Sequence, residues 1–208
     1  MNIGTRKIVV DEAIAQLRLY AETNGAVLQY YDGLPGMTTV GGSDPNRVTL
    51  DDLGRIMVIG ADLRAMDIPW LLEVEAEKEL AAIPVDARLE DAEPGSELFA
   101  AAMALDDKFT GHRGFGHAKK SKLLHLKRPY LYPVTDSFIR MTYGSASAGA
   151  EFLKAVREDL VNPANVRDFK LLQVRLIAEP ATSAARLLGE VPTLRLLDIL
   201  ASLLGEAK

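Results

Sequence analysis

Apolar residues recur at intervals of three and four along most of the chain, the spacing of one buried face on an α-helix. In residues 9–21 they include Ala13, Ile14 and Leu17. A second such stretch begins at Thr49, and an aspartate three residues later completes the capping pattern of a helix start. The pattern predicts an all-α protein built as a multi-helix bundle.

The expected helices are separated by Gly, Pro or polar clusters, which end helices and form turns. AVLQYYD at residues 26–32 is rich in strand formers and is expected to be extended, after a helix stop at Asn24 and Gly25. Residues 33–46 hold four Gly and two Pro and are expected to form a loop. The expected helices cover residues 9–21, 49–63, 69–80, 94–108, 118–126, 136–143, 151–160, 166–179, 182–188 and 193–204. We expect a single domain over residues 1–208, which can form one bundle or two lobes with a cleft between them.

Composition narrows the class of protein. The chain has 208 residues, of which 48% are hydrophobic and 25% charged, as in proteins that bury a globular core. It has no Cys, which excludes disulfides, thiolate metal ligands and iron–sulfur clusters. No stretch approaches the roughly 18 apolar residues of a membrane-spanning helix, and the N-terminus lacks the apolar run of a secretory signal. We therefore expect a cytoplasmic protein with no cofactor, no bound metal and no membrane partner.

Charge is distributed unevenly along the chain. The net charge is −5, but residues 108–128 hold seven Lys or Arg residues and no acid. Residues 73–97 hold nine acids against two basic residues. Such asymmetry can direct a basic face toward a polyanion. In the alternative interpretation, the two segments lie side by side and neutralise each other.

The basic segment contains a Gly-Phe-Gly turn between two expected helices. Gly114 and Gly116 allow a tight bend and close approach of the backbone, while Phe115 can anchor the turn in the core. The free N–H groups and the dipole at the start of the next helix favour a phosphate oxygen. The sequence therefore predicts contact with the DNA backbone, which positions a protein without reading sequence. The expected contact residues are Gly114, Gly116, His117, Lys119, Lys120, Lys122, Arg128 and Arg140.

GFGHAKKSKLL, followed about twenty residues later by PVTDSFIRMTYG, resembles the hairpin and catalytic helix of helix-hairpin-helix DNA glycosylases. The resemblance implies a helix-hairpin-helix-like unit at approximately residues 97–144, with Asp136 and Arg140 in the places of a catalytic Asp and a later Arg. The chain departs from the pattern where backbone-cleaving relatives carry Lys, because Ala118 stands there. Ser137 and Phe138 stand where a His usually follows the Asp. The resemblance therefore disfavours a Schiff-base lyase and leaves a monofunctional glycosylase.

Longer stretches resemble a family of uncharacterised bacterial helical domains common in high-GC bacteria. They are VTLDDLGRIMVIGADL, IPVDARLED, SKLLHLKRPYLYPVTDS and LRLLDIL, and together they extend over most of the chain. This resemblance implies a helical fold and supplies no activity.

Each candidate residue also has an ordinary structural interpretation. Asp136 is the candidate catalytic acid or base for a base flipped from the duplex, but an Asp at a helix start also serves as an N-cap. Trp70 could stack on a base, and core packing is its ordinary role. Arg195 and Asp198 are expected to form a surface pair, since they lie three apart on a helix. The remaining candidates are His112, His117 and His125, expected to face solvent or DNA because their spacing matches no metal template.

The leading hypothesis is a double-stranded-DNA-binding protein, with a divergent glycosylase as its narrower form. The alternative is a non-enzymatic helical domain that binds a protein partner and has lost DNA binding. The overall acidity favours this alternative.

Overall fold

The structure is a computed structural model that describes residues 1–32, 44–144 and 149–207. These residues form eleven α-helices, one 3-10 helix and a two-stranded antiparallel hairpin, which confirms the all-α prediction. The elements are β1 (Asn2–Ile3), β2 (Arg6–Lys7), α1 (Val10–Tyr31), α2 (Leu50–Val58), α3 (Asp67–Glu73), α4 (Glu77–Ala81), η1 (Leu89–Asp91), α5 (Glu97–Lys108), α6 (His117–Lys127), α7 (Ser137–Tyr143), α8 (Gly149–Val161), α9 (Pro163–Ala178), α10 (Ser183–Glu190) and α11 (Thr193–Glu206). Most of the loop expected at residues 33–46 lies outside the described residues. Within the described ranges, no helix is long and apolar enough to cross a membrane.

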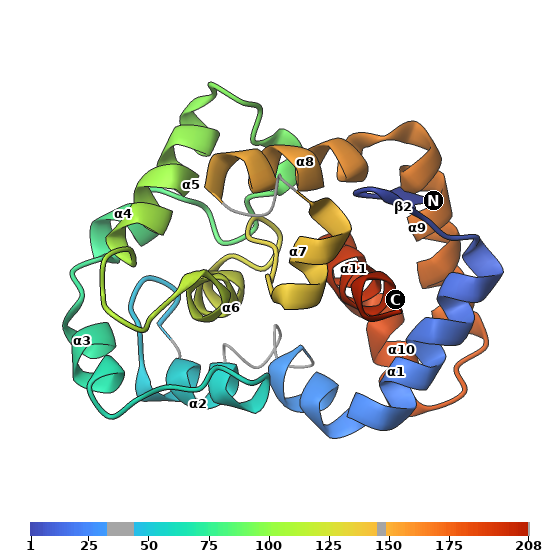
Figure 1. The fold of residues 1–208 in the computed structure, drawn as a ribbon, viewed down its shortest axis with the longest axis horizontal. Helices are drawn as coiled ribbons and strands as arrows, with labels where there is room; N and C mark the ends of the chain where they lie inside the picture. Colours follow the sequence, from blue (N-terminus) through green and yellow to red (C-terminus); the bar gives the residue numbers. More distant parts are fainter. Residues whose placement is uncertain (33–43, 145–148, 208) are drawn as a thin grey trace.

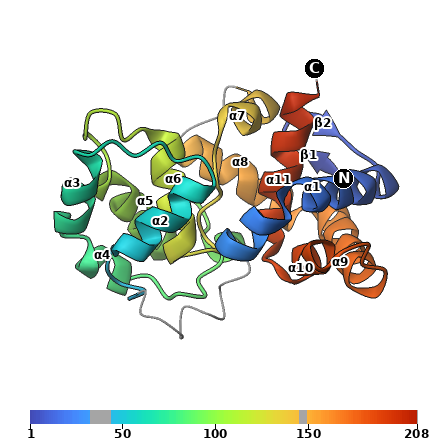
Figure 2. The ribbon, with the colours of Figure 1, turned by 90° about the horizontal axis from the view of Figure 1, so that it is seen from below.

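The helices gather in two groups, which Figures 1 and 2 show from two directions. We call α2 to α6 with η1 the middle lobe, and β1, β2, α1 and α9 to α11 the terminal lobe. The chain begins in the terminal lobe, builds the middle lobe and returns, so both ends of the chain belong to one lobe. Helices α7 and α8 lie between the two groups (Figure 1).

Helix α6 occupies the centre of the middle lobe. Figure 1 views it nearly along its axis, with the other helices of that lobe arranged around it. Seven of its eleven residues are buried, including the unbroken run from Lys120 to His125. Six consecutive residues cover every side of a helix, since each turns by about 100°. The helix with the most basic sequence is therefore an internal one.

The start of α2 confirms the predicted capping pattern. The backbone N–H of Asp52 donates to Oγ1 of Thr49 at 3.4 Å, and the N–H of Thr49 donates to Oδ2 of Asp52 at 2.7 Å. This reciprocal pair satisfies two backbone donors that the first turn cannot pair within the helix.

Helix α1 continues through the stretch expected to be extended, so that prediction was wrong. Asn24 leaves helical geometry, with φ −114° and ψ 20°, and the predicted helix stop is a kink inside a longer helix. Beyond the kink, Leu28 and Tyr31 are buried in the core. Their packing prevails over the strand preference of the local sequence, because such propensities are small beside the free energy of burying a large side chain.

Helices α7 and α11 pack closely beside the junction of the lobes. Gly205 of α11 is buried, and a Cβ at this position would run into the backbone carbonyl of Phe138. Nearby, Oγ1 of Thr142 donates to the carbonyl oxygen of Ala201 at 2.7 Å. The contact depends on a residue without a side chain at position 205.

Replacing Gly205 by Ala is expected to lower the free energy of unfolding by about 1–3 kcal/mol, because the new methyl group must push α7 and α11 apart. Urea unfolding followed by circular dichroism measures the change. Gly54→Ala in α2 is the matched control, since the nearest atom to its new Cβ is 3.9 Å away. That variant should be unchanged or more stable, because Ala favours a helix by up to about 1 kcal/mol over Gly. Equal stability of the two variants would contradict the close packing of α7 on α11.

Candidate nucleic-acid interface at the start of helix α6

The turn between α5 and α6 is built around one glycine and one phenylalanine. Gly114 has φ +87°, a conformation that strains any residue with a Cβ, and the guanidinium of Arg64 packs over it. Arg64 also donates to the carbonyl oxygen of Arg113. Phe115 is buried against Trp70, with ring centroids 5.4 Å apart. The predicted anchoring of the turn by Phe115 is confirmed, and Trp70 is one of its packing partners.

The first turn of α6 leaves backbone donors open. The carbonyl of Gly116 accepts from the N–H groups of Lys119 and Lys120, both at 3.1 Å. The N–H groups of Gly116, His117 and Ala118 have no partner among the described residues. Gly116 and Ala118 are exposed, and this turn contains no acidic side chain. The start of α6 therefore offers free amides and positive partial charge to an anion.

Three arginines that are at least partly exposed lie in or near this turn. Arg113 and Arg140 are exposed, and Arg64 is partly exposed where it packs on the turn. Arg140 lies near enough to His117 to help lower the pKa of that imidazole, after the larger effect of burial. Of the charged residues predicted to contact DNA, Arg140 is the one whose charged side chain the structure leaves exposed.

Two of the three predicted lysines, Lys119 and Lys120, are engaged by carboxylates. Nζ of Lys119 lies 3.3 Å from Oδ2 of Asp67. Nζ of Lys120 lies 2.5 Å from Oδ2 of Asp106 and donates to Oγ1 of Thr110 at 2.9 Å. These contacts match the alternative in which the basic segment is neutralised within the protein. Its acidic partners, however, lie mostly outside the acidic segment at residues 73–97.

Asp67 joins the turn to α3. Its carboxylate is fully buried and accepts from Nη2 of Arg64 at 2.6 Å, and it lies 3.1 Å from Nε2 of His112. The hydrogen bonds from Arg64 hold the pKa of Asp67 far below its ordinary value, against the opposing effect of burial. His112 in turn stacks on Trp70 at 4.2 Å. No local sequence signal connects Asp67 with partners 45 and 52 residues further along the chain.

The C-terminal end of α6 is also tied internally. Nζ of Lys127 lies 2.5 Å from Oδ2 of Asp52, with both side chains buried. Arg128 is fully buried and donates to the carbonyl oxygens of Ile83 at 2.8 Å and Pro45 at 2.9 Å. Arg128 was predicted to contact DNA, but here it connects the segments that surround the end of α6.

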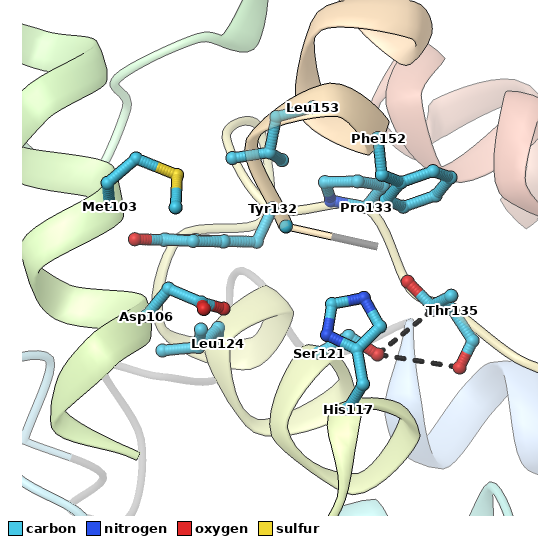
Figure 3. Close-up of a pocket in the computed structure, with 11 residues that line it drawn as sticks. Met103, Asp106, His117, Ser121, Leu124, Tyr132, Pro133, Thr135, Phe152 and Leu153 are labelled. Carbon is cyan, nitrogen blue, oxygen red and sulfur yellow. Dashed lines mark hydrogen bonds between the residues drawn. The ribbon is translucent and has the colours of Figure 1, made fainter. Parts of the chain in front are cut away.

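His117 lines a small cavity of about 20 Å³, together with Asp106 and Tyr132 (Figure 3). Its Nε2 is buried and has no hydrogen-bond partner among the described residues. Burial is the main cause that lowers the pKa of its imidazole, which favours the neutral form. One turn further along α6, Oγ of Ser121 accepts from the N–H of Thr135 at 3.0 Å (Figure 3). His117 therefore adds little positive charge to the start of α6.

Lys122 and Asp136 face a larger cavity, of about 250 Å³, between the lobes. Asp136 is the N-cap of α7, and its Oδ1 accepts from the N–H of Ile139 at 2.7 Å. Its Oδ2 accepts from Oγ of Ser202 at 2.8 Å. The capping interpretation of Asp136 is confirmed, while its catalytic role stays a prediction.

Two further predictions were wrong. Arg195 pairs with Asp32, through Nε at 2.7 Å and Nη2 at 3.1 Å, and not with Asp198; all three residues are buried. His125 does not face solvent or DNA, because it is buried with its Nδ1 2.7 Å from the carbonyl oxygen of Tyr132. Burial lowers the pKa of His125 to about 4. In the part of the chain that the structure describes, no group of His, Cys, Asp and Glu could hold a metal ion.

Asp67→Asn is expected to lower the free energy of unfolding at pH 7 by about 2 kcal/mol, because charge-assisted hydrogen bonds to a buried carboxylate are lost. The pKa of Asp67 is lower in the folded state, so its contribution is full above the unfolded value near 4. The contribution is lost as the pH falls below that value toward the folded pKa. Urea midpoints at pH 7 and pH 3 should therefore differ less between variant and wild type at the lower pH. Asp107→Asn, at an exposed position on α5, is the control. A difference that does not depend on pH would contradict the ionic role of Asp67.

Comparison with known proteins supplies a family but no activity. No curated protein and no solved structure matches the chain. Residues 13–205 match a family of unknown function, DUF6308. Because the match extends over nearly the whole chain, the protein belongs to the DUF6308 family.

Proposed function

We propose that the protein binds the phosphate backbone of double-stranded DNA at the start of α6. The open N–H groups of Gly116, His117 and Ala118 are the observation that carries this proposal. Backbone donors at a helix start bind phosphate oxygens through hydrogen bonds and the helix dipole. Arg113 and Arg140 add exposed positive charge around the same turn.

The geometry favours weak binding without sequence specificity. Contacts from amides and arginines to phosphates position a protein but do not distinguish bases. Lys119 and Lys120 are already paired with aspartates, so they add little net charge to the surface. We therefore expect affinity in the range of non-specific complexes, with a Kd of roughly 10⁻⁴–10⁻⁶ M.

Catalysis is not part of this proposal. Asp136 lines the cavity between the lobes, as a glycosylase would require of its acid or base. Both of its oxygens, however, already accept hydrogen bonds, from Ile139 and Ser202. Because these bonds stabilise the carboxylate in a structural role, we limit the proposal to binding.

A second candidate function is the binding of a protein partner. It is favoured by apolar side chains on the outer face of α9, where Leu171, Val174 and Ile177 are each 40–54% exposed. These residues are three apart and form one exposed apolar stripe along the helix. Exposed apolar patches of this kind often mark binding sites for other proteins. Under this function, the start of α6 would have no ligand.

Ala118→Asp tests the proposal without weakening the fold. Ala118 is exposed in the first turn of α6, where a carboxylate interacts favourably with the helix dipole. The same carboxylate would repel a phosphate and compete for the open amides. Titration of a fluorescent DNA duplex at two salt concentrations should show wild-type affinity falling with salt, with a slope of about 0.9 per phosphate contacted. Affinity should fall by about tenfold or more in Ala118→Asp, equivalent to about 1.4 kcal/mol or more.

Ala104→Asp is the matched control, because it places the same charge at an exposed position of α5, outside the turn. It should bind DNA nearly as well as the wild type. Equal weakening of both variants would indicate a general charge effect. Absence of salt-dependent binding by the wild-type protein would overturn the proposal and leave the protein-partner function.

A further inference from the structure

The cavity between the lobes has the features of a ligand site separate from the start of α6. Its volume is about 250 Å³, slightly below the roughly 300 Å³ at which drug-sized sites begin, which suits a small ligand. Its walls come from α1, the end of α2, α6, the start of α7 with the segment before it, and α11. The polar side chains that line it are Tyr20, Asn24, Lys122, Asp136, Arg195, Asp198 and Ser202.

Lys122 places an ammonium group without a partner on the wall of this cavity. The residue as a whole is only 9% exposed, and no hydrogen bond or ion pair of its Nζ occurs among the described residues. Burial lowers the pKa of this amine, while the charge of Asp136 acts in the opposite direction. A charge that is partly removed from water is stabilised by a partner of opposite sign, and the other three lysines of α6 each have a carboxylate partner. The structure therefore contains a cation that lacks its anion.

Three aspartates lie around the cavity, but their repulsion of a bound anion is reduced. Asp32 forms an ion pair with Arg195 and accepts two hydrogen bonds from its guanidinium. Burial raises the pKa of Asp198 well above its ordinary value, which favours its neutral form. Asp136 lies near Lys122, but both its oxygens accept hydrogen bonds from other groups. Arg195 is likewise neutralised by Asp32, so Lys122 is the cationic group on the cavity wall that has no ion-pair partner among the described residues.

We propose that the cavity between the lobes binds a small oxyanion, a phosphate or carboxylate group, with Lys122 as its cationic partner. Phosphates and carboxylates are the anions that Lys and Arg bind most commonly in proteins. The group could belong to a free small molecule or to the 5′ end of a nucleic-acid strand. A DNA duplex cannot enter a space of this size, so the site is distinct from the proposed backbone contact.

Isothermal titration with inorganic phosphate, acetate and a 5′-phosphorylated dinucleotide tests this inference. The wild-type protein should bind at least one of these probes, and Lys122→Met should weaken that binding by about tenfold or more. Without ligand, Lys122→Met should unfold at a higher urea concentration than the wild type, because a partly desolvated charge without a partner is removed. Lys170→Met, at an exposed position of α9, should leave both properties unchanged.

Ala118→Asp distinguishes this cavity from the start of α6. Under the inference it keeps the binding of all three probes, whatever its effect on duplex DNA. Binding lost in Ala118→Asp but kept in Lys122→Met would place the anion at the turn and overturn the inference. Failure of all three probes to bind the wild-type protein would overturn it as well. Tighter binding of the dinucleotide than of phosphate would indicate a strand end, and the reverse a free anion.

Discussion

The middle lobe depends on the burial of one basic helix. Removing the charges of Lys120 and Lys127 from water is unfavourable unless each meets a carboxylate. Asp106 of α5 and Asp52 of α2 provide these partners, and Asp67 of α3 provides another for Lys119. Because loss of either member leaves a buried charge, these ion pairs fix how the three helices pack around α6. Arg128 is also a buried cation, and it is stabilised by donating to the carbonyl oxygens of Ile83 and Pro45 in neighbouring segments.

This arrangement also determines what α6 can offer to a ligand. Most lysines of α6, which the sequence suggested for binding a polyanion, form ion pairs inside the protein instead. The proposed interface therefore consists of backbone amides with a few exposed arginines. Lys122 differs from its neighbours because no carboxylate in the described part of the chain forms an ion pair with it. The two proposed sites therefore belong to the same helix. The DNA contact uses the free backbone N–H groups of its first turn, and the anion site uses the ammonium of Lys122 between the lobes.

The sequence predicted features that depend on neighbouring residues. The helical pattern, the capping pair of Thr49 and Asp52 and the inward Phe115 follow from short-range spacing, and the structure confirms them. Features set by distant contacts were not predictable. Helix α1 continues past Asn24 because Leu28 and Tyr31 reach the core, and Arg195 pairs with Asp32, 163 residues away. The partners of the basic segment were missed for the same reason.

Amine labelling of the native protein, followed by mass spectrometry, tests the burial of α6 most directly. The account predicts that Lys120 and Lys127 react far more slowly than Lys7, Lys78 and Lys170, which are exposed. In urea, all five lysines should react at similar rates. Labelling of Lys120 and Lys127 in the folded protein as fast as the exposed lysines would contradict an internal basic helix held by aspartates.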